Sequence, residues 1–164
     1  MALTLDIVAM YRSPRTGIRR QLAMGTREDR VLFYVMLACG LIFIAQWPRL
    51  SREAYLDPSI PLDARIGGAL LGWFFLAPLL LYALAALTRV LARLVGGQGT
   101  WYTARLALFW SLLAASPLWL LNGLAAGFLG IGAGLQVTSG LALGVFLVFW
   151  GISFHETERT AVAV

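Results

Sequence analysis

The 164-residue chain contains one cysteine, one histidine and no lysine, and only 13% of its residues are charged. That share is about half of the roughly 25% found in soluble domains. The single cysteine, Cys39, excludes an intramolecular disulfide and a metal site built on several thiolates. All 13 positively charged residues are arginines, a bias that codon usage in a GC-rich genome explains as readily as a binding role.

Hydrophobic residues make up 60% of the chain, against roughly 45–50% in an ordinary soluble protein. The charged residues cluster between long apolar runs. The net charge of +5 does not indicate nucleic acid, because a nucleic-acid-binding protein needs a basic face on a folded polar domain and the sequence has none. The composition instead predicts a protein whose solvent is the lipid bilayer.

Four apolar runs are long enough to cross a hydrocarbon core about 30 Å thick, which needs roughly 20 helical residues. We therefore predict an all-α integral membrane protein, a bundle of four transmembrane helices. The predicted spans are 31–48, 66–88, 103–124 and 135–154. They form one domain (31–154) between an amphipathic, arginine-rich N-terminal segment (1–30) and a C-terminal tail (155–164).

The glycine-rich segment 123–134 decides the number of spans. We predict a turn at the interface or a shallow re-entrant piece, and a fifth span only if this segment belongs to an extra short helix. Pro78 and Pro117 are predicted helix breaks. Thr26 and Asp29 have the spacing of a capping box for the first span, and Thr100 is placed to cap the third.

The arginines predict an orientation. Ten of them flank the predicted spans on the side of the N-terminus and three on the other side, and cytoplasmic segments of membrane proteins carry the excess of positive charge. We therefore expect a bacterial inner (plasma) membrane protein with both ends in the cytoplasm. Residues 1–30 carry six arginines and no apolar h-region, which argues against a cleaved signal peptide.

The N-terminal segment has apolar residues at helical spacing (Leu3, Ile7 and Tyr11), a pattern typical of short helices in the headgroup layer. Arginines near an anionic membrane surface contribute about 1 kcal/mol each. The alternative is that they serve orientation alone. The candidate contacts with anionic lipid are Arg12, Arg15, Arg19, Arg20, Arg89, Arg93 and Arg105.

Pairs of glycines four residues apart let helix backbones approach closely in lipid. Such pairs pack helices within one subunit or between two subunits, and the pair at 140 and 144 is the candidate for a homo-oligomer interface. The pairs are Gly68 and Gly72, Gly123 and Gly127, Gly130 and Gly134, and Gly140 and Gly144.

No Asp, Glu, His or Lys falls within the predicted spans, although proton and ion relays need ionisable groups at that depth. A cavity lined by Asn122 and Gln136 would favour transport of a neutral solute. His155, Glu156 and Glu158 form a poor ligand set, and we predict a solvated helix end there. Without a nucleophile dyad, a zinc motif or a phosphate-binding loop, we predict no enzyme activity, cofactor or metal.

The order of these pieces resembles the Yip family, named for Ypt-interacting protein, and in particular its short bacterial members. The resemblance rests on YRSPRTGIRRQLAMGTRED before the first span and on GGQGTWYTARLALFWSLLAASPLWLL, and it covers the chain from about residue 10 onward. It implies a compact multi-helix membrane domain with a cytoplasmic N-terminus. Eukaryotic relatives act in vesicle traffic, bind prenylated small GTPases, associate with one another and are described with five spans.

The chain departs from the eukaryotic pattern ahead of the first span. Asp6, Tyr11 and Pro14 are too widely spaced to match the acidic, tyrosine-glycine-proline type of signature, so GTPase binding is not carried over. The leading hypothesis is a non-catalytic scaffold, assembly or membrane-organising factor. The alternatives are a small transporter or channel for a neutral solute and an accessory subunit of a larger membrane complex.

Overall fold

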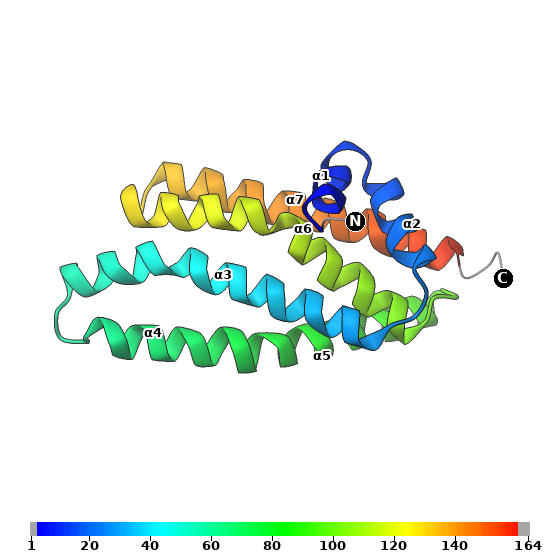
Figure 1. Ribbon diagram of the computed structural model, residues 1–164, viewed down its shortest axis with the longest axis horizontal. Helices are drawn as coiled ribbons and strands as arrows, with labels where there is room; N and C mark the ends of the chain where they lie inside the picture. Colours follow the sequence, from blue (N-terminus) through cyan, green and yellow to red (C-terminus); the bar gives the residue numbers. More distant parts are fainter. Residues whose placement is uncertain (1–2, 161–164) are drawn as a thin grey trace.

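The computed structural model describes residues 3–160, which fold into α-helices joined by short turns (Figure 1). A π-helical turn, η1, links α4 to α5, so Leu62–Leu94 is one continuous helix of 33 residues. The predicted all-α class is confirmed, and four helices are long and apolar enough to cross a membrane. The elements are α1 (Leu3–Arg12), α2 (Pro14–Ala23), α3 (Glu28–Leu56), α4 (Leu62–Leu71), η1 (Gly72–Leu76), α5 (Ala77–Leu94), α6 (Trp101–Phe128) and α7 (Ala133–Thr160).

Helix α6 is the centre of the bundle. It packs along α3 on one side and α7 on another, and it also contacts α5, while the long helices run side by side in Figure 1. In the most apolar window of each helix, 67% of the residues of α6 are buried but only 6% of those of α4–α5. The helix with the highest mean hydropathy, α4–α5, is therefore the most exposed, and α6, which has the lowest, is the most buried.

Helices α1 and α2 form an N-terminal hairpin that lies across α6 and α7 at one end of the bundle (Figure 1). Pro14 starts α2, where its missing N–H has no helical partner to lose. Met10 and Ile18 are fully buried in the common core, and a Cβ at Gly17 would collide with Met10. The amphipathic segment thus packs onto the bundle through its apolar face instead of only lying among headgroups.

The predicted start of the first span is wrong. Helix α3 begins at Glu28 after Arg27, and no side chain caps it. The Asp29 carboxylate instead accepts a hydrogen bond from the Arg27 guanidinium at 2.8 Å, which removes it from the capping box expected with Thr26. The cap predicted at Thr100 is present, since its hydroxyl accepts from the Thr103 N–H at 3.1 Å.

The four long helices extend beyond the predicted spans. Pro48 and Pro117 both lie inside helices, so neither proline ends a span. Pro78 is the second residue of α5, one residue after η1, and the Ala77 N–H before it donates to the Gly72 carbonyl. The wider π-helical turn accommodates the loss of one backbone hydrogen bond, which proline cannot donate because it has no N–H. Pro78 therefore marks a local change of helix geometry within a continuous span.

The glycine-rich segment 123–134 is neither a re-entrant piece nor a fifth span. Its first half continues α6 to Phe128, and its last residues begin α7 at Ala133. Only 129–132 form the turn, where Gly130 has a φ of +69°, a conformation that glycine adopts without strain. Within residues 3–160 the structure therefore holds four long apolar helices, as the main prediction states.

Charges lie in two layers at the ends of the bundle. The end that carries α1, α2 and the last turns of α7 is called here the terminal end, and the other end, with the turns 57–61 and 129–132, is the far end. On α3, residues 31–48 between Arg30 and Arg49 carry no charge, a length of about 27 Å at 1.5 Å per residue. That length matches a hydrocarbon core of about 30 Å.

Candidate functional site

At the terminal end, the Glu156 carboxylate anchors the N-terminal hairpin to α7. Arg19 donates to Glu156 with an Nη2–Oε2 distance of 2.8 Å, and the Nε atom of Arg15 lies 3.7 Å from Oε1. The Glu156 side chain is only 2% exposed. The predicted solvated helix end is therefore wrong for Glu156, because α2 covers it, whereas His155 is exposed.

A second carboxylate at the end of α7 holds the turn between α5 and α6. Glu158 accepts from the Gly99 N–H at 2.8 Å and lies 3.5 Å from Nη1 of Arg89. Arg89 also donates to the Gly97 carbonyl at 3.3 Å. A Cβ at Gly97 or Gly99 would collide with the Glu158 carboxylate, so the glycines of this turn make room for an ion pair.

Arg105 joins α6 to α3, since its guanidinium donates to Glu28 at 2.6 Å. Four of the seven arginines predicted to contact anionic lipid thus have carboxylate partners within the protein. These four are Arg15, Arg19, Arg89 and Arg105. The other three are exposed and, in the described part of the chain, belong to none of the ion pairs. They are Arg12, Arg20 and Arg93.

A hydrogen-bond network beneath this layer was not predicted. The Tyr34 hydroxyl donates to the Gln21 side-chain oxygen at 2.7 Å, and both residues are buried. Arg30 donates to the Tyr102 hydroxyl at 2.8 Å and to the Gly25 carbonyl at 2.7 Å. Because the network joins α2, α3, α6 and the turn before α3, its members follow no common spacing in the sequence.

A cavity of about 680 Å³ lies between the N-terminal hairpin and α3. We call it the hairpin cavity. It combines two side chains of opposite charge with apolar side chains and one tyrosine. Its lining residues are Leu3, Asp6, Arg20, Ala23, Met24 and Tyr34.

At the far end, α3 and α6 are in close backbone contact. A Cβ at Gly123 would meet the Ala45 carbonyl group, and one at Gly127 would meet Pro48. The remaining glycine pairs have different surroundings. Gly130 lies against the Arg52 guanidinium and Gly134 against Leu129, whereas a Cβ would find open space at Gly68, Gly72, Gly140 and Gly144.

A small polar pocket of about 120 Å³ lies beside this contact, between α3, α6 and α7. Gln46, Asn122 and Ser139 are among its lining residues. The Asn122 side-chain oxygen accepts from the Thr138 hydroxyl at 2.8 Å and from the Ser139 hydroxyl at 2.9 Å. Gln136, which was predicted to line a cavity with Asn122, is exposed and does not line the pocket. Gln46 lines it instead.

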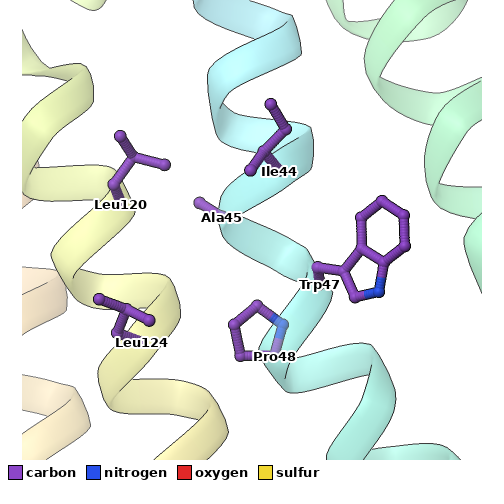
Figure 2. Close-up of a pocket in the computed structure, with 6 residues that line it drawn as sticks. All are labelled: Ile44, Ala45, Trp47, Pro48, Leu120 and Leu124. Carbon is purple, nitrogen blue, oxygen red and sulfur yellow. The ribbon is translucent and has the colours of Figure 1, made fainter.

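On the opposite side of the same helix contact lies an apolar groove of about 380 Å³. Figure 2 shows Leu120 and Leu124 of α6 facing Ala45 and Pro48 of α3 across it. The lining is entirely aliphatic and aromatic. Such a surface offers dispersion contacts and no polar group that would orient a ligand.

The far-end charges stabilise the two turns. Arg65 lies 3.2 Å from Asp57 and 3.6 Å from Glu53, and Arg52 donates to the last carbonyls of α6 at 3.2 and 3.3 Å. Hydrogen bonds from the Ser59 hydroxyl and N–H lower the pKa of Asp57, and the Arg65 charge lowers it further. These ion pairs and hydrogen bonds thus stabilise both turns of the far end.

Comparison with known proteins gives no family assignment. No protein-family model, no curated protein and no solved structure matches the chain.

Proposed function

We propose that the chain is a multi-pass membrane protein of the Yip type that acts without catalysis as a scaffold, assembly or membrane-organising factor. The observation that carries the proposal is the inverse order of hydropathy and burial. A chain folding in water buries its most apolar helix, whereas here α4–α5 is both the most apolar and the most exposed. Lipid is the solvent that makes this arrangement stable, because acyl chains are as apolar as the exposed leucines.

The proposed membrane is the bacterial inner membrane, with the terminal end in the cytoplasm. The support is the arginine distribution, ten at the terminal end against three at the far end, in the direction of the positive-inside rule. Internal pairing does not weaken this support, because the rule counts arginines and lysines and gives little weight to acids.

The scaffold role rests on the exposed helix faces. Phe75, Leu79 and Leu80 lie on α4–α5 with 66%, 71% and 67% of their surfaces exposed, and this helix contacts the rest of the bundle mainly through α3 and α6. A face of this kind is available to lipid or to a helix of a partner. The quoted resemblance to the Yip family supports the same role; its first motif covers α2 and the turn before α3, and its second covers the turn into α6 and most of that helix.

A second candidate function is passage of a neutral solute, favoured by the polar pocket that Gln46, Asn122 and Ser139 line. A solute-flux assay in liposomes distinguishes the two functions. For a scaffold, we expect purified protein in sealed liposomes to move small neutral solutes at the rate of protein-free liposomes. The same tagged protein, extracted from its membrane in polymer-bounded native discs, should retain a stoichiometric protein partner or an enriched lipid.

Solute uptake well above the protein-free control, abolished by Asn122→Leu, would reject the scaffold proposal in favour of transport. Co-purification of a complete respiratory or other energy-transducing assembly would favour the third possibility, an accessory subunit.

A further inference from the structure

We propose that the hairpin cavity binds the headgroup of one phospholipid that carries both a phosphate and a primary ammonium group, as phosphoethanolamine lipids do. The inference deepens the proposed function and rests on it, because it requires the bundle to lie in a membrane. Two lining residues carry it: Arg20 on α2 and Asp6 on α1.

Within residues 3–160, neither of these two side chains has a charged partner in the protein. In the described residues, Asp6 and Arg20 take part in none of the ion pairs, with each other or with any third residue. Both nevertheless line one cavity. A guanidinium and a carboxylate facing the same space without pairing are complementary to a ligand that brings one negative and one positive group.

The chemistry of the two groups selects the headgroup. A guanidinium binds phosphate through two parallel N–H···O bonds, and a carboxylate accepts N–H bonds from a primary ammonium. A glycerol headgroup would satisfy Arg20 but leave Asp6 next to the anionic phosphate. A trimethylammonium headgroup has no N–H to donate to Asp6. The zwitterion with a primary amine meets both requirements.

The position of the cavity fits a lipid headgroup. Tyr34, which forms part of its wall, is one helical turn beyond Arg30, the last charged residue before the apolar stretch of α3. The cavity thus lies where headgroups meet hydrocarbon. Leu3, Ala23 and Met24 supply apolar wall, and the volume of about 680 Å³ falls within the roughly 300–1,000 Å³ of small-molecule sites.

The test uses the full-length protein in nanodiscs that contain equal amounts of phosphatidylethanolamine, phosphatidylglycerol and phosphatidylcholine. Native mass spectrometry after release counts the lipids that remain bound. We expect one retained phosphatidylethanolamine per protein, in about tenfold preference to the other two lipids. A tenfold preference corresponds to about 1.4 kcal/mol.

Matched variants separate the two charges. Asp6→Asn should abolish the preference for ethanolamine over choline while phosphate binding remains, and Arg20→Gln should lower retention of all three lipids. Arg159→Gln is the control, since Arg159 is exposed at the terminal end, is not among the candidate lipid contacts and does not line the cavity; it should bind like the parent protein. Circular dichroism confirms that each variant is folded.

Equal retention of phosphatidylglycerol, or an Asp6→Asn variant that keeps the full preference, would overturn the inference. So would loss of the bound lipid on addition of millimolar inorganic phosphate, which would identify a phosphate site. Failure of the proposed function is recognised separately, because a protein that does not insert fails to float with the lipid and never enters the nanodiscs.

Discussion

Glu156 shows how a single buried carboxylate can join the N-terminal hairpin to α7. Its carboxylate is 2% exposed, while its partners Arg15 and Arg19 are 67% and 64% exposed. The carboxylate is thus sheltered beneath α2 while the guanidinium groups remain near the surface. An arrangement of this kind depends more on the buried partner, because the exposed groups can regain hydration when the pair is broken.

Replacing Glu156 by Gln should loosen the N-terminal hairpin. The charged hydrogen bond from Arg19 is lost, and we expect the free energy of unfolding in detergent to fall by about 1–3 kcal/mol. Limited proteolysis should cut faster within residues 1–30. Arg159→Gln is the control, since Arg159 lies at the same helix end, is exposed and forms none of the ion pairs in the described chain. Equal behaviour of the two variants would refute the anchoring role.

The far-end turn should respond to acid through Asp57. Its pKa is lowered from the ordinary 3.8, first by the Ser59 hydrogen bonds and then by Arg65. A lowered folded-state pKa contributes stability above the ordinary value, and this contribution is lost as the pH falls through the folded value. We therefore expect proteolysis at 57–61 to accelerate below about pH 4.

Asp57→Asn serves as the comparison for that titration. It should show the faster cleavage already at neutral pH and little further change on acidification. A variant whose cleavage follows the same pH profile as the parent would exclude Asp57 as the responsible group. Titration of the Asp57 carboxyl carbon by NMR gives the direct measurement.

Individual site residues were the least predictable part of the sequence. The sequence singled out the arginines but could not assign their carboxylate partners. The ion pairs Arg19–Glu156, Arg89–Glu158 and Arg105–Glu28 join residues that are 137, 69 and 77 positions apart. Periodicity reports only local spacing. The hairpin cavity was missed for the same reason.

At the scale of helices, close backbone approach distinguishes glycine pairs that share one sequence pattern. Gly123 and Gly127 lie against Ala45 and Pro48 of α3, whereas Gly140 and Gly144 lie against nothing in the described structure. The pattern alone states that close approach is possible. Only the position of the neighbouring helix determines where it occurs.

Gly123→Ala should push α3 away from α6, because the new methyl group would collide with the Ala45 backbone. Overpacking of this kind costs about 1–3 kcal/mol, which thermal unfolding in detergent would detect as a lower Tm. Gly140→Ala is the matched control. It enters open space, and alanine favours a helix interior over glycine by about 1 kcal/mol, so the Tm should stay the same or rise.

A clearly lower Tm of the Gly140→Ala variant would contradict the open space found around Gly140 in the described structure. Loss of an oligomer by size-exclusion chromatography in the same variant would place Gly140 and Gly144 in a subunit interface, the use considered from the sequence.

The all-α class and the number of long apolar helices in the described chain were predictable, because apolar length is a strong local signal. Their ends were not. Arg27 displaced the cap expected from Thr26 by pairing with Asp29, and α3 continued through Pro48 to Leu56. Prolines near the end of a span are tolerated where neighbouring groups satisfy the freed backbone, and this depends on packing that the sequence does not display.

For the molecule as a whole, the two charge layers predict a topology that cysteine labelling can test. Single cysteines at Gln98 and Ser59, in the turns at the terminal and far ends, should react with a membrane-impermeant maleimide from opposite sides of the membrane. Gln98→Cys should label only after the cytoplasmic side is opened. The native Cys39 is fully buried and should stay unlabelled in the parent protein, which is the control. Labelling of both positions from one side would contradict four spans with this orientation.

The ion pair between Arg19 and Glu156 can form only late in the synthesis of the chain. The two residues are 137 positions apart, so at synthesis rates of about 5–20 residues per second the hairpin waits on the order of ten seconds for α7 to be made. During that interval the hairpin that holds Met10 and Ile18, fully buried in the finished bundle, lacks its contacts with α7. For a chain that inserts into a bilayer, the membrane surface would shelter these side chains meanwhile, so the amphipathic pattern of the first helices would serve the nascent chain before the folded protein.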